Sequence, residues 1–191
     1  LEEKVVIGIT GLPGSGKSTI ARIAKKLGYP VVVMGDFLRE EAKKRGMKLT
    51  AENLGKLMFQ IRKEKGSDVI AKMTVEAIKK INNPVVLIDG IRSLEEVEEF
   101  KRNFKDFRLV AVKAREELRF KRISRRLRSD DIKVWKKFKE RDKHELEVGV
   151  GKVIETADQT IHNNGTLKEF KNKIRKFLEE INLEVSFKRR S

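Results

Sequence analysis

The feature that most constrains this chain is a glycine-rich segment near its start, Gly11-Leu12-Pro13-Gly14-Ser15-Gly16-Lys17-Ser18. It matches the phosphate-binding Walker A pattern G-x-x-x-x-G-K-[ST], follows the apolar run Val5 to Thr10, and precedes apolar residues at helical spacing. Glycines let the backbone curl so that several N–H groups point at one phosphate, and the next helix adds its positive N-terminal end. The sequence therefore predicts a strand, a phosphate loop (P-loop) and a helix, in that order.

The side chains of this loop predict how ATP and Mg²⁺ are held. Lys17 has the length and charge to reach the β- and γ-phosphates, and the Ser18 hydroxyl can bind the Mg²⁺ that bridges them. Thr19 offers a second hydroxyl that is less well placed for the metal. The residues expected to contact ATP here are Gly11, Gly14, Ser15, Gly16, Lys17, Ser18 and Thr19.

Short runs rich in Val and Ile alternate with longer helical patterns along the whole chain. The runs are Val5 to Thr10, Val31 to Met34, Pro84 to Asp89, Leu109 to Ala114 and Thr160 to His162. This alternation predicts an α/β fold with three layers, in which a parallel sheet is flanked by helices on both faces. Residues 36–82 are expected to form a helical acceptor-binding insertion, and no linker divides residues 1–191 into separate domains.

Acidic and basic residues follow two of the predicted strands. Asp36 and Arg39 come after the second, and Asp89 and Arg92 come at the end of the third. Ligands of open parallel sheets gather outside the carboxyl ends of the strands. We therefore expect Asp89 to hold Mg²⁺, Asp36 to lie near the attacking oxygen of an acceptor, and the two arginines to bind the acceptor's phosphate.

Each of these residues also has a purely structural alternative. Asp36 could cap its own helix, and the two arginines could be solvated surface residues. Asp89 could cap the helix that follows it, but Ser93 is better placed for that role, with Glu96 completing a capping box.

The same segments resemble those of nucleoside monophosphate kinases. Met34-Gly35-Asp36-Phe37-Leu38-Arg39 is similar to the G-D-x-L-R segment of adenylate kinases, and Asp89-Gly90-Ile91-Arg92 resembles their D-G-F-P-R without the proline and with its arginine one residue early. The whole chain resembles an archaeal branch of predicted P-loop nucleotide kinases related to adenylate kinase and dephospho-CoA kinase. The resemblance implies that Arg39 contacts the acceptor phosphate, and that Asn163 and Gly165 border the adenine ring; an ordinary turn is the alternative there.

A basic stretch, residues 119–143, is expected to act as a short lid over the nucleotide. Arg122 and Arg128 are our candidates to face the phosphates, although helical spacing does not separate them from Arg119 and Arg126. The segment beginning at Arg128 resembles the R-x-D-D of the adenylate kinase lid, but Arg141 falls about two positions late for the next arginine of that pattern. A solvated helix face is the alternative.

Composition limits the remaining classes. The chain has no cysteine, which removes disulfides and thiolate chemistry, and its many Lys and Glu residues resemble those of hyperthermophile proteins. We expect a cytoplasmic protein with no membrane association. A net charge of +16 suits phosphorylated substrates, but it also leaves nucleic acid open.

The sequence predicts an ATP- and Mg²⁺-dependent kinase that acts on a small acceptor, with a nucleoside monophosphate preferred. Dephospho-CoA is the alternative acceptor. Dephospho-CoA kinases usually carry D-A-D where this chain has Met34-Gly35-Asp36, so only the last acid is retained and the motif does not settle the acceptor. The alternative of another class is an RNA-associated ATPase or nucleotide-dependent switch.

Overall fold

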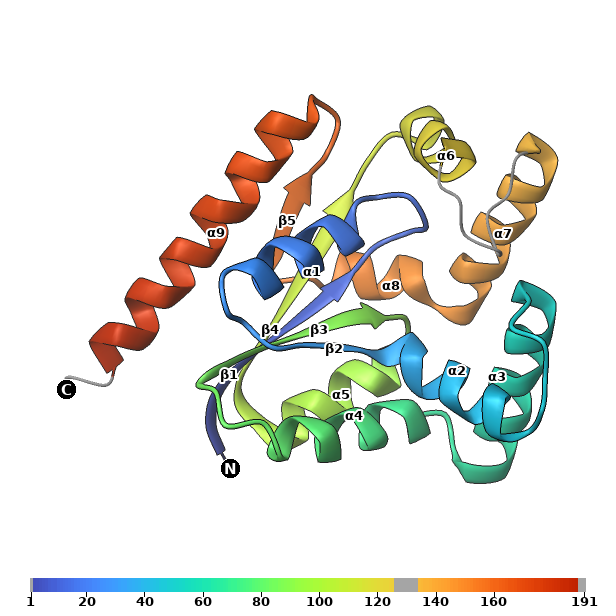
Figure 1. The fold of residues 1–191 in the computed structure, drawn as a ribbon, viewed down its shortest axis with the longest axis horizontal. Helices are drawn as coiled ribbons and strands as arrows, with labels where there is room; N and C mark the ends of the chain where they lie inside the picture. Colours follow the sequence, from blue (N-terminus) through green and yellow to red (C-terminus); the bar gives the residue numbers. More distant parts are fainter. Residues whose placement is uncertain (1, 126–133, 189–191) are drawn as a thin grey trace.

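The computed structural model describes residues 2–125 and 134–188, and within them five parallel strands form one sheet (Figure 1). The strand order is β2-β3-β1-β4-β5. The strands are β1 (Glu2–Thr10), β2 (Val31–Val33), β3 (Val85–Ile91), β4 (Phe104–Lys113) and β5 (Gln159–His162). Each predicted apolar run overlaps one of these strands, so the predicted parallel α/β fold is confirmed.

Helices cover both faces of the sheet, which gives three layers (Figure 1). One face is covered by α1 (Lys17–Lys26) and α9 (Leu167–Lys188). The other is covered by α4 (Val69–Lys79), α5 (Leu94–Asn103) and α8 (Val150–Glu155). Two apolar cores fill the space between these layers, and apolar residues of α9, including Phe170 and Ile174, belong to the core of the first face.

Four further helices lie toward the carboxyl ends of the strands (Figure 1). They are α2 (Met34–Lys44), α3 (Ala51–Lys65), α6 (Glu116–Arg125) and α7 (Trp135–Val148). Of the residues expected in the second strand, Met34 instead opens α2, directly after the three-residue β2. The edge of the sheet where ligands of this fold class bind is therefore flanked by α2 and α3 on one side and by α6 and α7 on the other.

The third strand is longer than its apolar run indicates. It continues past Asp89 to Ile91, and the pairing with β1 shifts there, since Ile9 pairs with Asp89 but Thr10 pairs with Ile91. The Thr10 hydroxyl donates a hydrogen bond of 2.8 Å to the Ile91 carbonyl. This bulge lies at the end of the central strand pair, beside the P-loop.

No helix in the described part of the chain is long and apolar enough to cross a membrane.

Candidate active site

The P-loop follows β1, the middle strand of the sheet, and its backbone requires glycine. Gly14 and Gly16 have φ angles of 78° and 121°, in the left-handed region. A Cβ at Gly14 would lie 2.6 Å from the Arg119 carbonyl oxygen, and one at Gly16 would lie 2.5 Å from Asn163 Nδ2. Any larger residue at these positions would be strained and would collide with its neighbours, so the loop can curl this tightly only with glycine.

The start of α1 fits a bound phosphate. Its N-cap is Gly16, no side chain caps its first N–H groups, and its first turn has no acidic residue. The buried Ser15 hydroxyl makes no hydrogen bond to any described residue. Because uncapped N–H groups at a helix start attract anions, the loop suits the phosphates of ATP.

Lys17 lies in this cradle, as its place in the motif predicts. Its ammonium group donates hydrogen bonds to the carbonyls of Gly11 and, at 3.2 Å, of Leu12. Burial lowers the pKa of Lys17 from 10.5 to about 8, although the negative charge of Asp89 acts in the opposite direction. An incoming phosphate would supply the counter-charge that this ammonium group lacks.

Ser18 and Asp89 both face the cavity beside the P-loop. Among the described residues, the Asp89 carboxylate makes no hydrogen bond or ion pair. Both side chains offer oxygen, the ligand that Mg²⁺ prefers, and Mg²⁺ in kinase sites is held by one or two protein groups together with substrate phosphates. The described residues contain no group of three His, Asp or Glu side chains that could hold a metal alone, so this donor set fits a metal that arrives with its nucleotide.

The cavity has a volume of about 1350 Å³ and brings together residues from several distant segments. It joins the P-loop to the strand ends, to α6 and α7, and to the loop after β5. The predicted site residues that line it are Gly11, Gly14, Gly16, Lys17, Ser18, Thr19, Asp36, Arg39, Asp89, Arg92, Arg122, Asn163 and Gly165. Arg128 lies outside the described residues.

Asp36 and Arg39, which both line this cavity, form an ion pair of 2.8 Å. The Asp36 side chain does not cap α2, whose N-cap is Val33. The helix after β3 is capped by Ser93, whose hydroxyl accepts from the Glu96 N–H at 3.4 Å. The expected capping box is altered, because Glu96 reaches the N–H of Arg92, not that of Ser93.

The two arginines of α6 near the P-loop have different surroundings. Arg119 is buried and makes a two-fold ion pair with Asp142 of α7, and it also donates to the Pro13 carbonyl at 3.1 Å. Its guanidinium lies 5.1 Å from the centre of the Phe138 ring. Arg122 faces the cavity and donates to the Asn163 carbonyl at 2.9 Å. The Arg119 side chain therefore links α6, α7 and the P-loop, whereas the Arg122 side chain can contact a ligand in the cavity.

Asn163 is tied to the P-loop. Its buried side chain donates to the Ser15 carbonyl at 2.7 Å and accepts from Arg122 at 3.2 Å. Gly165 lies nearby in the cavity wall. The loop after β5 thus supports the P-loop directly, a contact that the sequence resemblance did not indicate.

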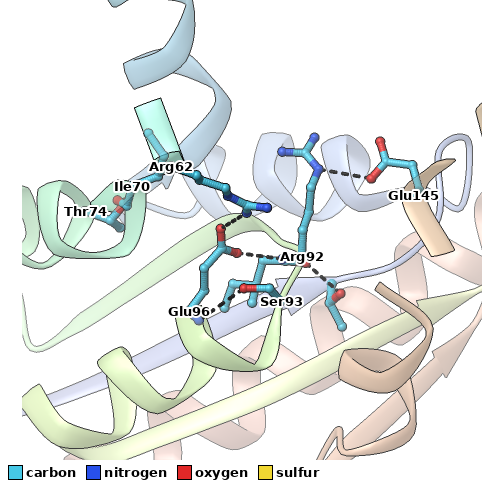
Figure 2. A network of polar contacts seen from close by, with 9 residues as sticks. Arg62, Ile70, Thr74, Arg92, Ser93, Glu96 and Glu145 are labelled. Carbon is cyan, nitrogen blue, oxygen red and sulfur yellow. Dashed lines mark hydrogen bonds and ion pairs between the residues drawn. The ribbon is translucent and has the colours of Figure 1, made fainter. Parts of the chain in front are cut away.

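Two further residues of α7, Arg141 and Glu145, line the cavity. Glu145 accepts a hydrogen bond of 3.2 Å from Arg92 Nε (Figure 2). No strand end or motif marks Glu145 in the sequence, and the only signal is its helical spacing from Arg141, four residues earlier.

Trp135 and Phe138 pack against Phe120 of α6, with ring centroids 5.0 Å and 5.4 Å from it. Phe138 is fully buried. These two aromatic residues therefore serve packing between α6 and α7.

Comparison with known proteins places the whole chain in a family. A family model described as an AAA domain matches residues 10–139. A UPF0200 protein of Pyrococcus horikoshii is 42% identical over 181 residues, which cover 93% of this chain and 97% of the relative. A UPF0200/UPF0201 protein of Archaeoglobus fulgidus is 44% identical over 97% of this chain, which spans 59% of that relative's length.

Solved structures share the fold at lower identity. The crystal structure of TT1252 from Thermus thermophilus has a TM-score of 0.66 and 20% identity, over 94% of this chain and 98% of that one. A dephospho-CoA kinase from Campylobacter jejuni has a TM-score of 0.59 and 17% identity, over 92% of this chain and 96% of that one. A shikimate kinase from Acinetobacter baumannii has a TM-score of 0.58 and 18% identity, over 95% and 94%. The chain therefore carries an AAA domain of the P-loop type, belongs to the UPF0200 family, and has the fold of the P-loop kinases.

Proposed function

We propose that this protein is an ATP- and Mg²⁺-dependent kinase that transfers the γ-phosphoryl group to a small phosphorylated acceptor, with a nucleoside monophosphate preferred. The observation that carries the proposal is a cavity lined both by the P-loop and by two arginines, Arg39 of α2 and Arg92 just after β3. The P-loop would hold the donor, and the arginines would hold an anionic acceptor opposite it.

The roles of the remaining residues follow from their positions. Lys17 would contact the β- and γ-phosphates, and Ser18 and Asp89 would hold Mg²⁺, which neutralises charge on those phosphates when bound. Arg122 would stabilise negative charge on the transferred group. Most of the rate enhancement would come from positioning and from these fixed positive charges.

The chemistry of transfer favours a phosphate acceptor over a hydroxyl acceptor. In either reaction the bond from the γ-phosphorus to its bridging oxygen breaks, and a bond to an acceptor oxygen forms. The second pKa of a phosphate monoester is about 6, so its oxygen is already ionised at neutral pH and no base has to remove a proton. A hydroxyl acceptor would need a base, and Asp36 is already paired with Arg39.

Two alternatives stay open because specific observations favour them. The similarity in fold to a dephospho-CoA kinase supports a dephospho-CoA kinase-like activity. The net charge of +16 supports an RNA-associated ATPase or nucleotide-dependent switch. The cavity arginines argue for a small-molecule nucleotide partner over RNA, and we further propose a cytoplasmic location.

Purified protein with radiolabelled ATP and Mg²⁺ would test these functions against one another. The acceptors are AMP, CMP, UMP, GMP, dephospho-CoA and a control without acceptor, and Lys17→Ala is the inactive variant. We expect label on a nucleoside monophosphate, whereas label on dephospho-CoA would establish a dephospho-CoA kinase activity. Release of inorganic phosphate alone, together with RNA binding that weakens steeply with salt, would refute the kinase proposal.

A further inference from the structure

Glu145 lies, with Asp36 and Asp89, among the carboxylates of a cavity whose charged lining residues are mostly basic. It comes from α7, its side chain is only 14% exposed, and its Oε2 accepts a hydrogen bond of 3.2 Å from Arg92 Nε. Burial acts to raise the pKa of Glu145, but the charges of Arg92, Lys17 and Arg141 outweigh it, so the pKa lies below its usual range. Glu145 is thus an ionised group held in the site by its cationic neighbours.

Arg92 is held at two points by residues of different helices (Figure 2). Its backbone N–H donates to Glu96 Oε2 at 2.8 Å, and Glu96 Oε1 accepts from Arg62 of α3 at 2.9 Å. Its side chain is held by Glu145 of α7. The position of Arg92 therefore depends on α3, α5 and α7 together.

The contact with Glu145 uses one particular nitrogen of Arg92. Nε donates to the carboxylate, whereas the two terminal amino groups make no hydrogen bond to any described residue. Arg92 lines the cavity, and Figure 2 shows these two amino groups pointing away from Glu145. Two parallel N–H donors of this kind match two oxygens of a phosphate.

We propose that Glu145 is a positioning residue for the acceptor: it holds Arg92 by Nε and so presents the two terminal amino groups of Arg92 to the acceptor's phosphate. The inference rests on the proposed function for the identity of the acceptor. It gives Glu145 of α7, 53 residues beyond Arg92 in the sequence, a part in acceptor binding that acts through Arg92.

Charge and position make opposite predictions for the loss of Glu145. Removing a negative charge beside Arg92, Lys17 and Arg141 makes the cavity more positive, which by itself would strengthen binding of an anion. Releasing Arg92 lets its side chain move among several rotamers, which would weaken binding. The direction of the change in acceptor affinity therefore separates positioning from simple electrostatics.

The test is steady-state kinetics of Glu145→Ala, Glu145→Gln and the control Glu147→Ala with the acceptor that the wild-type protein phosphorylates. Glu147 is also on α7, but its side chain is 61% exposed and its nearest partner, Lys143, is 3.9 Å away. We expect Glu145→Ala to raise the acceptor KM about tenfold while the KM for ATP changes less than about twofold. Glu145→Gln should recover part of the loss because its amide oxygen can still accept from Nε, and Glu147→Ala should behave as wild type.

A double-mutant cycle ties the effect to Arg92. In an Arg92→Ala background, Glu145→Ala should add no further increase in acceptor KM, because there is no side chain left to position. An unchanged or lower acceptor KM in Glu145→Ala, or an equal further increase without Arg92, would overturn the inference.

If the wild-type protein phosphorylates none of the acceptors, the proposed function has failed, and the inference is then decided by binding alone. The probe is inorganic phosphate, titrated with the P-loop saturated by a non-hydrolysable ATP analogue, and the readout is the ¹⁵N resonance of Arg92 Nε. We expect phosphate to bind wild type about tenfold more tightly than Glu145→Ala, and the Nε resonance to shift in that variant. Equal affinities or an unmoved resonance would refute the positioning role.

Discussion

Replacing Lys17 with methionine should stabilise the ligand-free protein at neutral pH while removing its affinity for ATP. Methionine keeps most of the length of lysine but has no charge to bury. The Lys17 pKa is lowered from 10.5 to about 8, which corresponds to about 3 kcal/mol at about 1.4 kcal/mol per pKa unit. The hydrogen bonds that methionine loses, to the carbonyls of Gly11 and Leu12, offset about 1 kcal/mol each. We expect a net gain of about 1–2 kcal/mol at pH 7.

The pH dependence of this gain follows from the direction of the pKa change. Below pH 8 lysine is charged in both the folded and the unfolded chain, so the full penalty of burying the charge is present. Between about 8 and 10.5 only the unfolded chain keeps the proton, so the wild-type protein gains stability relative to Lys17→Met as the pH rises. The advantage of Lys17→Met should therefore fall by about 3 kcal/mol across this window.

Urea denaturation of both proteins at pH 7, 8, 9 and 10, in buffers free of phosphate and sulfate, measures this difference. Other titrating groups cancel in the comparison because both proteins carry them. Adding phosphate at pH 7 should reduce the advantage of Lys17→Met, since an anion in the loop stabilises the charged lysine. A difference between the two proteins that stays constant from pH 7 to 10 would refute the reasoning.

Three further variants test the other parts of the site. Asp89→Asn should raise the Mg²⁺ concentration needed for half-maximal transfer but leave nucleotide binding nearly unchanged, and identical Mg²⁺ titrations would remove Asp89 from the metal site. Arg122→Ala should lower the transfer rate by about a hundredfold or more with a smaller change in ATP affinity, and full activity would rule out its proposed role. Arg119→Ala should destabilise the protein by about 3–5 kcal/mol because it leaves Asp142 buried without its partner. The control Lys139→Ala, which breaks an exposed ion pair between the same two helices, should cost less than about 1 kcal/mol in urea denaturation, and similar losses for both would contradict this account.

Local patterns made much of the fold predictable. The glycine spacing of the P-loop indicates one backbone path, because only glycine adopts the φ angles found at Gly14 and Gly16. The alternation of Val- and Ile-rich runs with helical stripes predicts a parallel sheet covered on both faces. These two features also predict where Asp89, Arg92 and Arg39 lie. Parallel strands end on the same side of the sheet, so residues that follow them lie at the same edge.

Spacing along a helix did not separate Arg119 from Arg122, three residues apart on α6. The structure separates them, because packing of α7 brings Asp142 and Phe138 to Arg119 and leaves Arg122 beside Asn163 and the cavity.

The sequence by itself determined that a phosphate loop lies at the centre of a parallel α/β sheet, since that information is contained in a few consecutive residues and in short periodic runs. Only the tertiary structure decided that Glu145 meets Arg92 and that Glu96 joins Arg92 to Arg62. Glu145 is 53 residues from Arg92 in the sequence, and Arg62 is 34 residues from Glu96. An ion pair of that kind depends on how α3 and α7 dock beside β3, and no local propensity specifies the relative placement of helices so distant in the chain.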